Sequence, residues 1–146
     1  MPTTLSPPAR PILAWTDLLL VRHDAIDADH RHLFAVASRL HAGIREGEGK
    51  SLVREIFREL MAYAREHFAR EEALMAAIRF SEKEEHVFEH RLLTYRLNNL
   101  LYQFEGGQSN LAEELEIFLD RWLARHILTS DLQFAQSVRA SAASSS

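Results

Sequence analysis

Apolar residues recur along this chain at intervals of three and four, the spacing that places them on one face of an α-helix. Four segments carry such a stripe, separated by short polar or glycine-containing connections. They span approximately residues 27–44, 51–78, 81–104 and 110 onward. Four amphipathic helices with short connections predict an all-α fold, an up-down-up-down antiparallel four-helix bundle.

The two ends of the chain depart from this pattern. Residues 1–14 are rich in Pro, Thr and Ser and predict a flexible, extended N-terminal arm. The bundle is expected to occupy residues 15–136 as one domain of ordinary size. The Ser- and Ala-rich residues 137–146 predict a disordered tail.

Six polar residues interrupt the apolar stripes. They are five histidines and one glutamate: His30, His67, Glu71, His86, His90 and His126. A lone buried histidine is most often a hydrogen-bonded core residue, but this set is spread over all the helices and would converge in one small core. A buried carboxylate is costly unless it is paired or bound to a metal. The stripes therefore predict a shared metal site. The other histidines, His23, His32 and His41, lie off the stripes and are expected at the surface or rim.

Composition limits what the protein binds. The chain of 146 residues has no cysteine, which excludes thiolate zinc sites, disulfides and a cysteine nucleophile. Its net charge is −4 with both signs interspersed, so no nucleic-acid partner is expected. No segment approaches the roughly 20 apolar residues of a membrane span. No secretory signal is recognisable at the N-terminus, which predicts a cytoplasmic protein.

The ligand set indicates which metal is bound. Imidazole suits Zn, Cu, Fe and Ni, whereas carboxylates favour harder ions. Five imidazoles and one carboxylate exceed the ligands of a single four-coordinate zinc, which indicates two metal ions. A mixed nitrogen and oxygen shell favours iron.

Four motifs resemble those of the hemerythrin family, and especially the bacterial hemerythrins. In chain order they are IDADHRHLF (26–34), HFAREEALM (67–75), HVFEH (86–90) and WLARHILTSD (122–131). Each motif is weak alone, but all of them occur in the family's order, one on each predicted helix. The ligands carried over from the family are His30, His67, Glu71, His86, His90, His126 and Asp131.

The resemblance implies a non-haem di-iron centre, with two Fe ions joined by an oxo or hydroxo bridge. The implied ligands are His30 and His67 for one iron and His86, His90 and His126 for the other, with Glu71 and Asp131 bridging. One coordination position then remains, on the iron with two histidines, and the family binds O2 there reversibly. Trp122, Leu123 and Ile127 are candidates to line an apolar O2 pocket, although ordinary core packing explains them equally well.

His126 and Asp131 are five residues apart, which in a regular α-helix turns them about 140° away from each other. Both can face one metal pair if the helix widens, so a π-type or distorted turn is predicted from Leu128 to Asp131. The chain departs from the bacterial pattern at Asp29, where glutamine is common, and at Arg22, where glycine is common. Neither residue is expected to touch a ligand.

Other functions use similar residues. HVFEH fits the H-x-x-E-H pattern of one zinc-protease class, with Glu89 as catalytic base, but the rest of such a site is missing and Glu89 is expected to be solvated. Ferritin-like di-iron oxidases use Glu-x-x-His pairs, which none of the stripe histidines has. A di-iron enzyme reducing peroxide or nitric oxide, an O2 sensor, or a metal store would need the same ligands.

The interpretation adopted is reversible O2 binding by a non-enzymatic protein, for oxygen storage, transport or delivery. The expected partners are O2 and an O2-consuming enzyme that receives it. The chain is expected to be a monomer.

Overall fold

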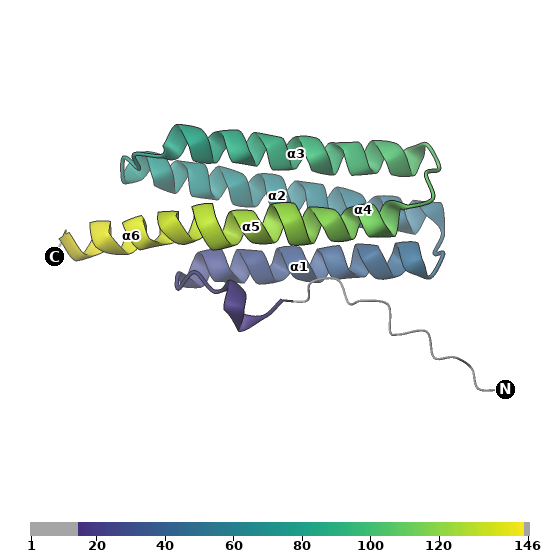
Figure 1. Cartoon of the computed structure of the whole chain (residues 1–146), viewed down its shortest axis with the longest axis horizontal. Coiled ribbons are helices and arrows are strands. Elements are labelled where there is room, and N and C mark those ends of the chain that lie inside the picture. The colour runs from purple at the N-terminus through teal and green to yellow at the C-terminus, as the bar shows by residue number, and fades with distance from the viewer. Residues whose placement is uncertain (1–14, 145–146) are drawn as a thin grey trace.

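Long helices make up most of the structure, a computed structural model that describes residues 15–144. These residues contain no β-strand, which confirms the all-α prediction. A 3-10 turn, η1 (Asp17–Leu19), precedes three uninterrupted helices: α1 (Asp24–Arg45), α2 (Lys50–Ala77) and α3 (Lys83–Glu105). Figure 1 shows the helices side by side along the long axis of the molecule, with successive helices joined at alternate ends.

The fourth helical rod is built from five consecutive segments. In chain order they are α4 (Leu111–Ile117), the π-helix η2 (Phe118–Leu123), α5 (Ala124–His126), the π-helix η3 (Ile127–Asp131) and α6 (Leu132–Ser144). The residues at each junction keep helical φ and ψ angles, so the segments form one continuous rod. The spacing of apolar residues therefore located the four long helical segments, but it did not show where the fourth one changes its winding or where it ends.

The core divides along the bundle axis into an apolar half and a polar half. The half near the α1–α2 and α3–α4 connections is filled by aliphatic and aromatic side chains, among them Leu40, Phe57, Leu97, Leu100 and Leu115. Each such side chain contributes roughly 1.5–3 kcal/mol when it is fully buried. The half near the α2–α3 connection contains buried histidines and carboxylates, surrounded by buried apolar side chains such as Phe134 and Ile127. The apolar half therefore provides the stability that a polar centre in the other half requires.

The segment before α1 is hydrogen-bonded to α1 and to α6. Its Val21 and His23 backbone amides donate to the Asp27 carboxylate, at 2.8 and 3.2 Å. Arg139 of α6 donates to the carbonyl oxygens of Val21 and Arg22, at 2.7 and 3.0 Å. Arg22 has a φ of 67°, in the left-handed region that favours glycine. This geometry explains why glycine suits position 22.

Of the two chain ends that were predicted to lack regular structure, the described residues include only part of the C-terminal one. The predicted arm, residues 1–14, lies outside the described residues. The structure differs from the predicted disordered tail, because residues 137–144 continue α6. Val138 packs against the core, and Arg139 is held by the carbonyl oxygens before α1. Alanine has the highest helix propensity, so a Ser- and Ala-rich composition does not by itself end a helix that is already anchored.

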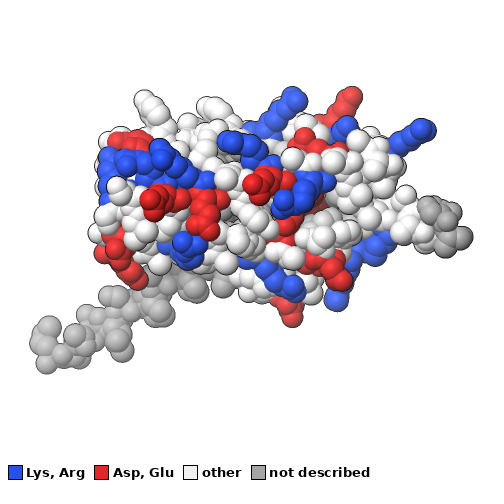
Figure 2. Space-filling view, turned by 180° about the vertical axis from the view of Figure 1, so that it is seen from behind, with Lys and Arg blue, Asp and Glu red and all other residues white. Residues whose placement is uncertain are grey.

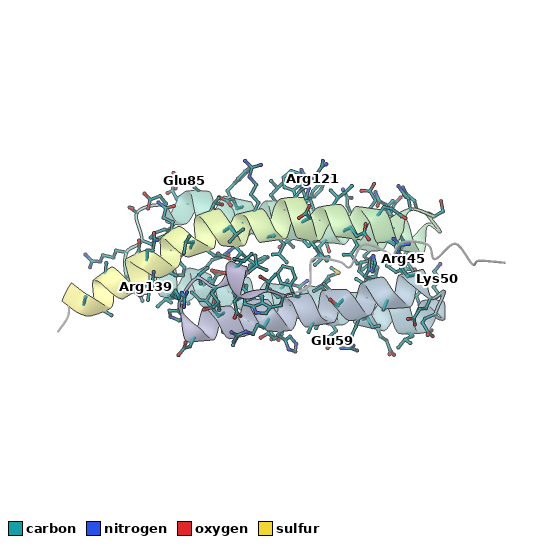
Figure 3. All side chains as sticks on the ribbon, turned by 60° about the horizontal axis from the view of Figure 1, so that its bottom comes forward. Arg45, Lys50, Glu59, Glu85, Arg121 and Arg139 are labelled. Atoms are coloured by element: carbon teal, nitrogen blue, oxygen red, sulfur yellow. The ribbon has the colours of Figure 1, made fainter. Side chains whose placement is uncertain are left out.

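Charged side chains of both signs are intermixed on the molecular face drawn in Figure 2. Glu59, Glu85 and Arg121 point outward from their helices (Figure 3). Among the described residues, no helix is long and apolar enough to cross a membrane.

Candidate metal centre

All the residues predicted to bind metal lie in the polar half of the core. His30 comes from α1, His67 and Glu71 from α2, His86 and His90 from α3, His126 from α5, and Asp131 from the last position of η3. None of these side chains is more than 4% exposed. The predicted ligands therefore converge, although the first and the last of them, His30 and Asp131, are 101 positions apart in the sequence.

The π-helix η3 is what brings Asp131 into the centre. It spans Ile127–Asp131 and so includes Leu128 to Asp131, for which a widened turn was predicted; this prediction is confirmed. A π-turn pairs residues five apart instead of four, so Asp131 falls on the same face as His126. The second π-helix, η2, was not predicted, because no pair of required ligands revealed it in the sequence.

Asp131 lies at the middle of the centre. Its Oδ2 is 3.0 Å from His30 Nε2, while its Oδ1 is 2.9 Å from His86 Nε2 and 3.1 Å from His126 Nε2. The two carboxylate oxygens thus face histidines on opposite sides. Asp131 is shared by two groups of potential ligands, one with His86, His90 and His126 and the other with His30, His67 and Glu71. Within each group the ligand atoms lie within 4.8 Å of one another.

Glu71 faces both groups as well. Its Oε1 is 2.7 Å from His67 Nε2 and 3.7 Å from His90 Nε2, and its Oε2 is 3.9 Å from His86 Nε2. Together with Asp131, Glu71 is positioned to bridge two cations. The division of the histidines into two and three agrees with the ligand assignment that the family resemblance implies.

The hydrogen-bonding state of these atoms tests whether metal ions fit. Several buried atoms that face the centre lie close to one another but have no partner in hydrogen-bonding geometry: the Nε2 atoms of His30, His90 and His126, Glu71 Oε1 and Oε2, and Asp131 Oδ2. Buried polar atoms are almost always partnered, and leaving them unpartnered is costly. Cations between the two groups would satisfy them all at once. Imidazole nitrogens with carboxylate oxygens are a donor set that iron accepts.

The electrostatics of the metal-free protein are dominated by the same cluster. Burial and the nearby Asp131 raise the pKa of Glu71 well above the usual carboxyl range. Burial alone would raise the pKa of Asp131 too, but the charge of His126 and the imidazoles that lie against the Asp131 carboxylate hold that pKa well below its usual value. Asp131 in turn raises the pKa of His126 to about 10, despite burial. In the metal-free protein, burial therefore favours the neutral form of Glu71, whereas His126 and Asp131 favour each other's charged form.

Three carboxylates surround the centre on its outer side, and we refer to Asp29, Glu72 and Glu89 as the outer acids. Each lies close to the Nδ1 atom of one predicted ligand: Asp29 with His67 at 2.8 Å, Glu72 with His90 at 2.8 Å, and Glu89 with His126 at 2.7 Å. Accepting a hydrogen bond from Nδ1–H leaves the Nε2 lone pair free for a metal ion and fixes the ring orientation.

Two expectations about the outer acids were wrong. Asp29 was expected not to touch a ligand, and Glu89 to be solvated. Glu89 is only partly exposed, and it accepts hydrogen bonds from both His126 and Ser130. A signal was present in the sequence: each outer acid directly adjoins a ligand of its own helix. A step of one residue turns about 100° around a helix, which aims the acid at the neighbouring helix. Because Glu89 is engaged there, the protease interpretation of HVFEH has no catalytic base.

The three residues predicted to line an O2 pocket differ in burial. Leu123 and Ile127 are buried, at 5% and 0% exposure, as an apolar lining requires. Trp122 is only partly buried, and the Arg96 guanidinium carbon lies 3.3 Å from its ring centroid. Trp122 lines a surface groove of about 720 Å³, to which His126 also contributes. The structure therefore places Trp122 outside the buried centre.

The remaining histidines take no part in the centre. His32 is exposed, as expected, and His23 accepts a hydrogen bond from the Ile26 amide at the start of α1. His41 is buried rather than solvated, because α4 packs against α1 there, and its Nε2 lies 2.9 Å from Glu116.

Comparison with known proteins agrees with this geometry. A family model described as Hemerythrin HHE cation binding domain matches residues 21–136, most of the chain and all seven converging side chains. The chain belongs to the hemerythrin family. The description of the domain as cation-binding agrees with the unpartnered histidine and carboxylate atoms at its centre.

Several curated hemerythrins are similar over most of their length. A bacteriohemerythrin of Stenotrophomonas maltophilia is 30% identical over 129 residues, which cover 88% of this chain and 83% of the relative. One from Pseudomonas aeruginosa is 30% identical over 127 residues, covering 87% and 82%. One from Clostridium acetobutylicum is 25% identical over 127 residues, covering 84% and 98%. No solved structure gave a significant match.

Proposed function

We propose that this hemerythrin binds O2 reversibly at a non-haem di-iron centre, for oxygen storage, transport or delivery. The observation that carries the proposal is that two ligand groups share Asp131 but are unequal. One group has three histidines, whereas the other has two histidines and Glu71. Because Glu71 and Asp131 face both groups, an ion in the second group would have one protein ligand fewer than an ion in the first. Open coordination positions are where metal centres take up external ligands. A pair of ferrous ions would supply the electrons that O2 requires for binding.

The residues around the centre support reversible binding by excluding water. The ring of Phe68 stacks on His90 with centroids 4.1 Å apart, and Phe134 lies edge-on to His86 at 5.8 Å. Ile127 and Phe134 are completely buried. A water-poor, low-dielectric surrounding disfavours the release of charged reduced oxygen species, because separating charge there is costly. Bound O2 would then leave as the neutral molecule.

The placement of the acids supports a carrier rather than an enzyme. General acid catalysis needs a protonated side chain that reaches the reacting atom. Each outer acid is engaged by a histidine Nδ1, and Glu71 and Asp131 face the metal positions. Among the described residues, this leaves no carboxylic acid at the centre uncommitted. The proposal includes a monomeric, cytoplasmic protein that passes O2 to an O2-consuming enzyme and has no nucleic-acid partner.

An optical titration of the iron-loaded protein tests the proposal. We expect about two iron ions per chain, as the ligand count requires. Charge-transfer bands should appear on admission of air and vanish on deoxygenation, over repeated cycles. His30→Gln should abolish the bands, whereas His32→Gln, two positions away and exposed, should retain them.

Two results would contradict reversible binding. Bands that form once and persist would show irreversible oxidation, and turnover with peroxide or nitric oxide would then become the leading function. A wild-type chain that takes up no iron would contradict the metal assignment itself.

A further inference from the structure

Asp29 is held more firmly than any other carboxylate around the centre. It accepts hydrogen bonds from Tyr63 Oη at 2.7 Å, from Arg70 Nη2 at 2.9 Å and from Arg70 Nε at 3.2 Å. The fourth contact, at 2.8 Å, is with Nδ1 of His67. Both carboxylate oxygens are used, and the three partners all come from α2, while Asp29 belongs to α1. We call Asp29, Tyr63 and Arg70 the α1–α2 clamp.

The other outer acids have no comparable support. Glu72 has His90 as its only hydrogen-bond partner among the described contacts, and Glu89 has His126 and Ser130. Neither of them bonds to an arginine. Two-pronged bonding between a guanidinium and a carboxylate restricts both groups to one geometry and is stronger than bonds between neutral groups. The clamp therefore fixes the His67 ring more rigidly than the other acids fix theirs.

The two ligand groups differ in how many of their histidines are held by an outer acid at Nδ1. In the group of three histidines, His90 and His126 each have an outer acid. In the group of two, Nδ1 of His30 is buried and has no hydrogen-bond partner in the described structure. Among the described residues, His67 is thus the only imidazole on that side whose Nδ1 is held by an acid. Loss of this contact would leave the two-histidine group without an acid-held imidazole, whereas the other group would keep two.

We propose that the α1–α2 clamp is a positioning device that controls metal occupancy of the two-histidine group. The clamp holds the His67 ring so that Nε2 faces the ion, and releasing it converts a protein that binds two ions into one that binds a single ion tightly. The inference rests on the metal-binding part of the proposed function and does not depend on O2 chemistry. Removing an acid that orients a ligand typically weakens metal affinity about 10- to 100-fold.

The test is a Co²⁺ titration of the metal-free full chain, followed by absorption and by metal analysis. For Asp29→Asn we expect the affinity for one of two ions to fall about 10- to 100-fold while the other is unchanged. Arg70→Gln, which leaves Asp29 in place, should produce a smaller loss at the same ion. Glu59→Gln is the matched control: its carboxylate also joins α1 to α2 through an arginine, Arg39, but on the outer surface and away from every ligand (Figure 3).

Each outcome decides the inference. Equal weakening of both ions, accompanied by a lower unfolding midpoint of the metal-free protein, would show a structural role only. Unchanged affinities in both clamp variants would overturn the inference while the wild-type stoichiometry of two still supports the metal centre. A wild-type chain that binds fewer than two ions would overturn both. If Asp29→Asn fails to fold, Arg70→Gln alone decides, because its side chain is exposed by 51%.

Discussion

Substituting Glu71 by methionine should stabilise the metal-free protein while destroying the metal centre. Glu71 is 2% exposed, and neither of its carboxyl oxygens has a partner in hydrogen-bonding geometry, although Oε1 lies 2.7 Å from His67 Nε2. A buried polar group left unsatisfied costs about 1–3 kcal/mol. Methionine has a similar volume and flexible packing, so Glu71→Met removes this cost without opening a cavity. The free energy of unfolding of the metal-free protein should therefore rise by about 1–3 kcal/mol.

With metal present the sign should reverse. A ligand that binds only the folded state stabilises it by about 2.7 kcal/mol at a concentration one hundred times its dissociation constant. Glu71→Met loses one of the two carboxylates that face both ligand groups, so it should lose most of this gain. Wild type should then be the more stable of the two.

Urea unfolding followed by circular dichroism measures both effects, with EDTA in one series and excess Co²⁺ in the other. Glu55→Met, an exposed position on the same helix, is the control and should change stability by no more than about 0.5 kcal/mol. The reasoning is refuted if metal-free Glu71→Met is less stable than wild type by more than about 1 kcal/mol, since the carboxyl group would then be satisfied within the protein.

Three further predictions concern the surroundings of the centre. Asp131, despite burial, raises the pKa of His126 to about 10 from 6.5 in the folded metal-free protein. As the pH rises, the unfolded chain loses this proton at a lower pH than the folded protein does, so the stability that the proton gives is lost as the pH approaches 10. The free energy of unfolding, measured with urea, should therefore fall as the pH rises from 6.5 to 10, by at most about 1.4 kcal/mol per unit of pKa shift. This pH dependence should vanish in the metal-loaded protein. Glu89→Gln should weaken Co²⁺ binding about 10- to 100-fold, measured by titration, with an unchanged affinity contradicting its orienting role. Phe134→Ala should cost about 3–5 kcal/mol in urea unfolding, whereas Phe88→Ala, exposed by 65%, should cost little; equal effects would contradict the burial argument.

The sequence by itself determined the helices and most of the centre. Apolar residues at intervals of three and four located each helix, since that spacing is a local property of the chain. Histidines such as His67 and His90 stood out because they occupy stripe positions, where solvent exposure is not available to them. The π-turn at Asp131 followed from spacing once the family resemblance had identified Asp131 as a ligand, because two ligands five residues apart had to face one site. The other inferences needed only helical geometry and the cost of burying polar groups.

Only the tertiary structure decided which residues support the ligands. Asp29 meets His67, and Glu89 meets His126, across distances of 38 and 37 positions, so each contact depends on how two helices are packed and in which register. The same holds for α6 beyond residue 136, whose Arg139 is anchored by carbonyl oxygens 118 and 117 positions away. Local composition describes what a segment would do alone. Contacts between distant segments supply the energy that orders a Ser- and Ala-rich end, and they turn acids that look solvated into parts of the metal centre.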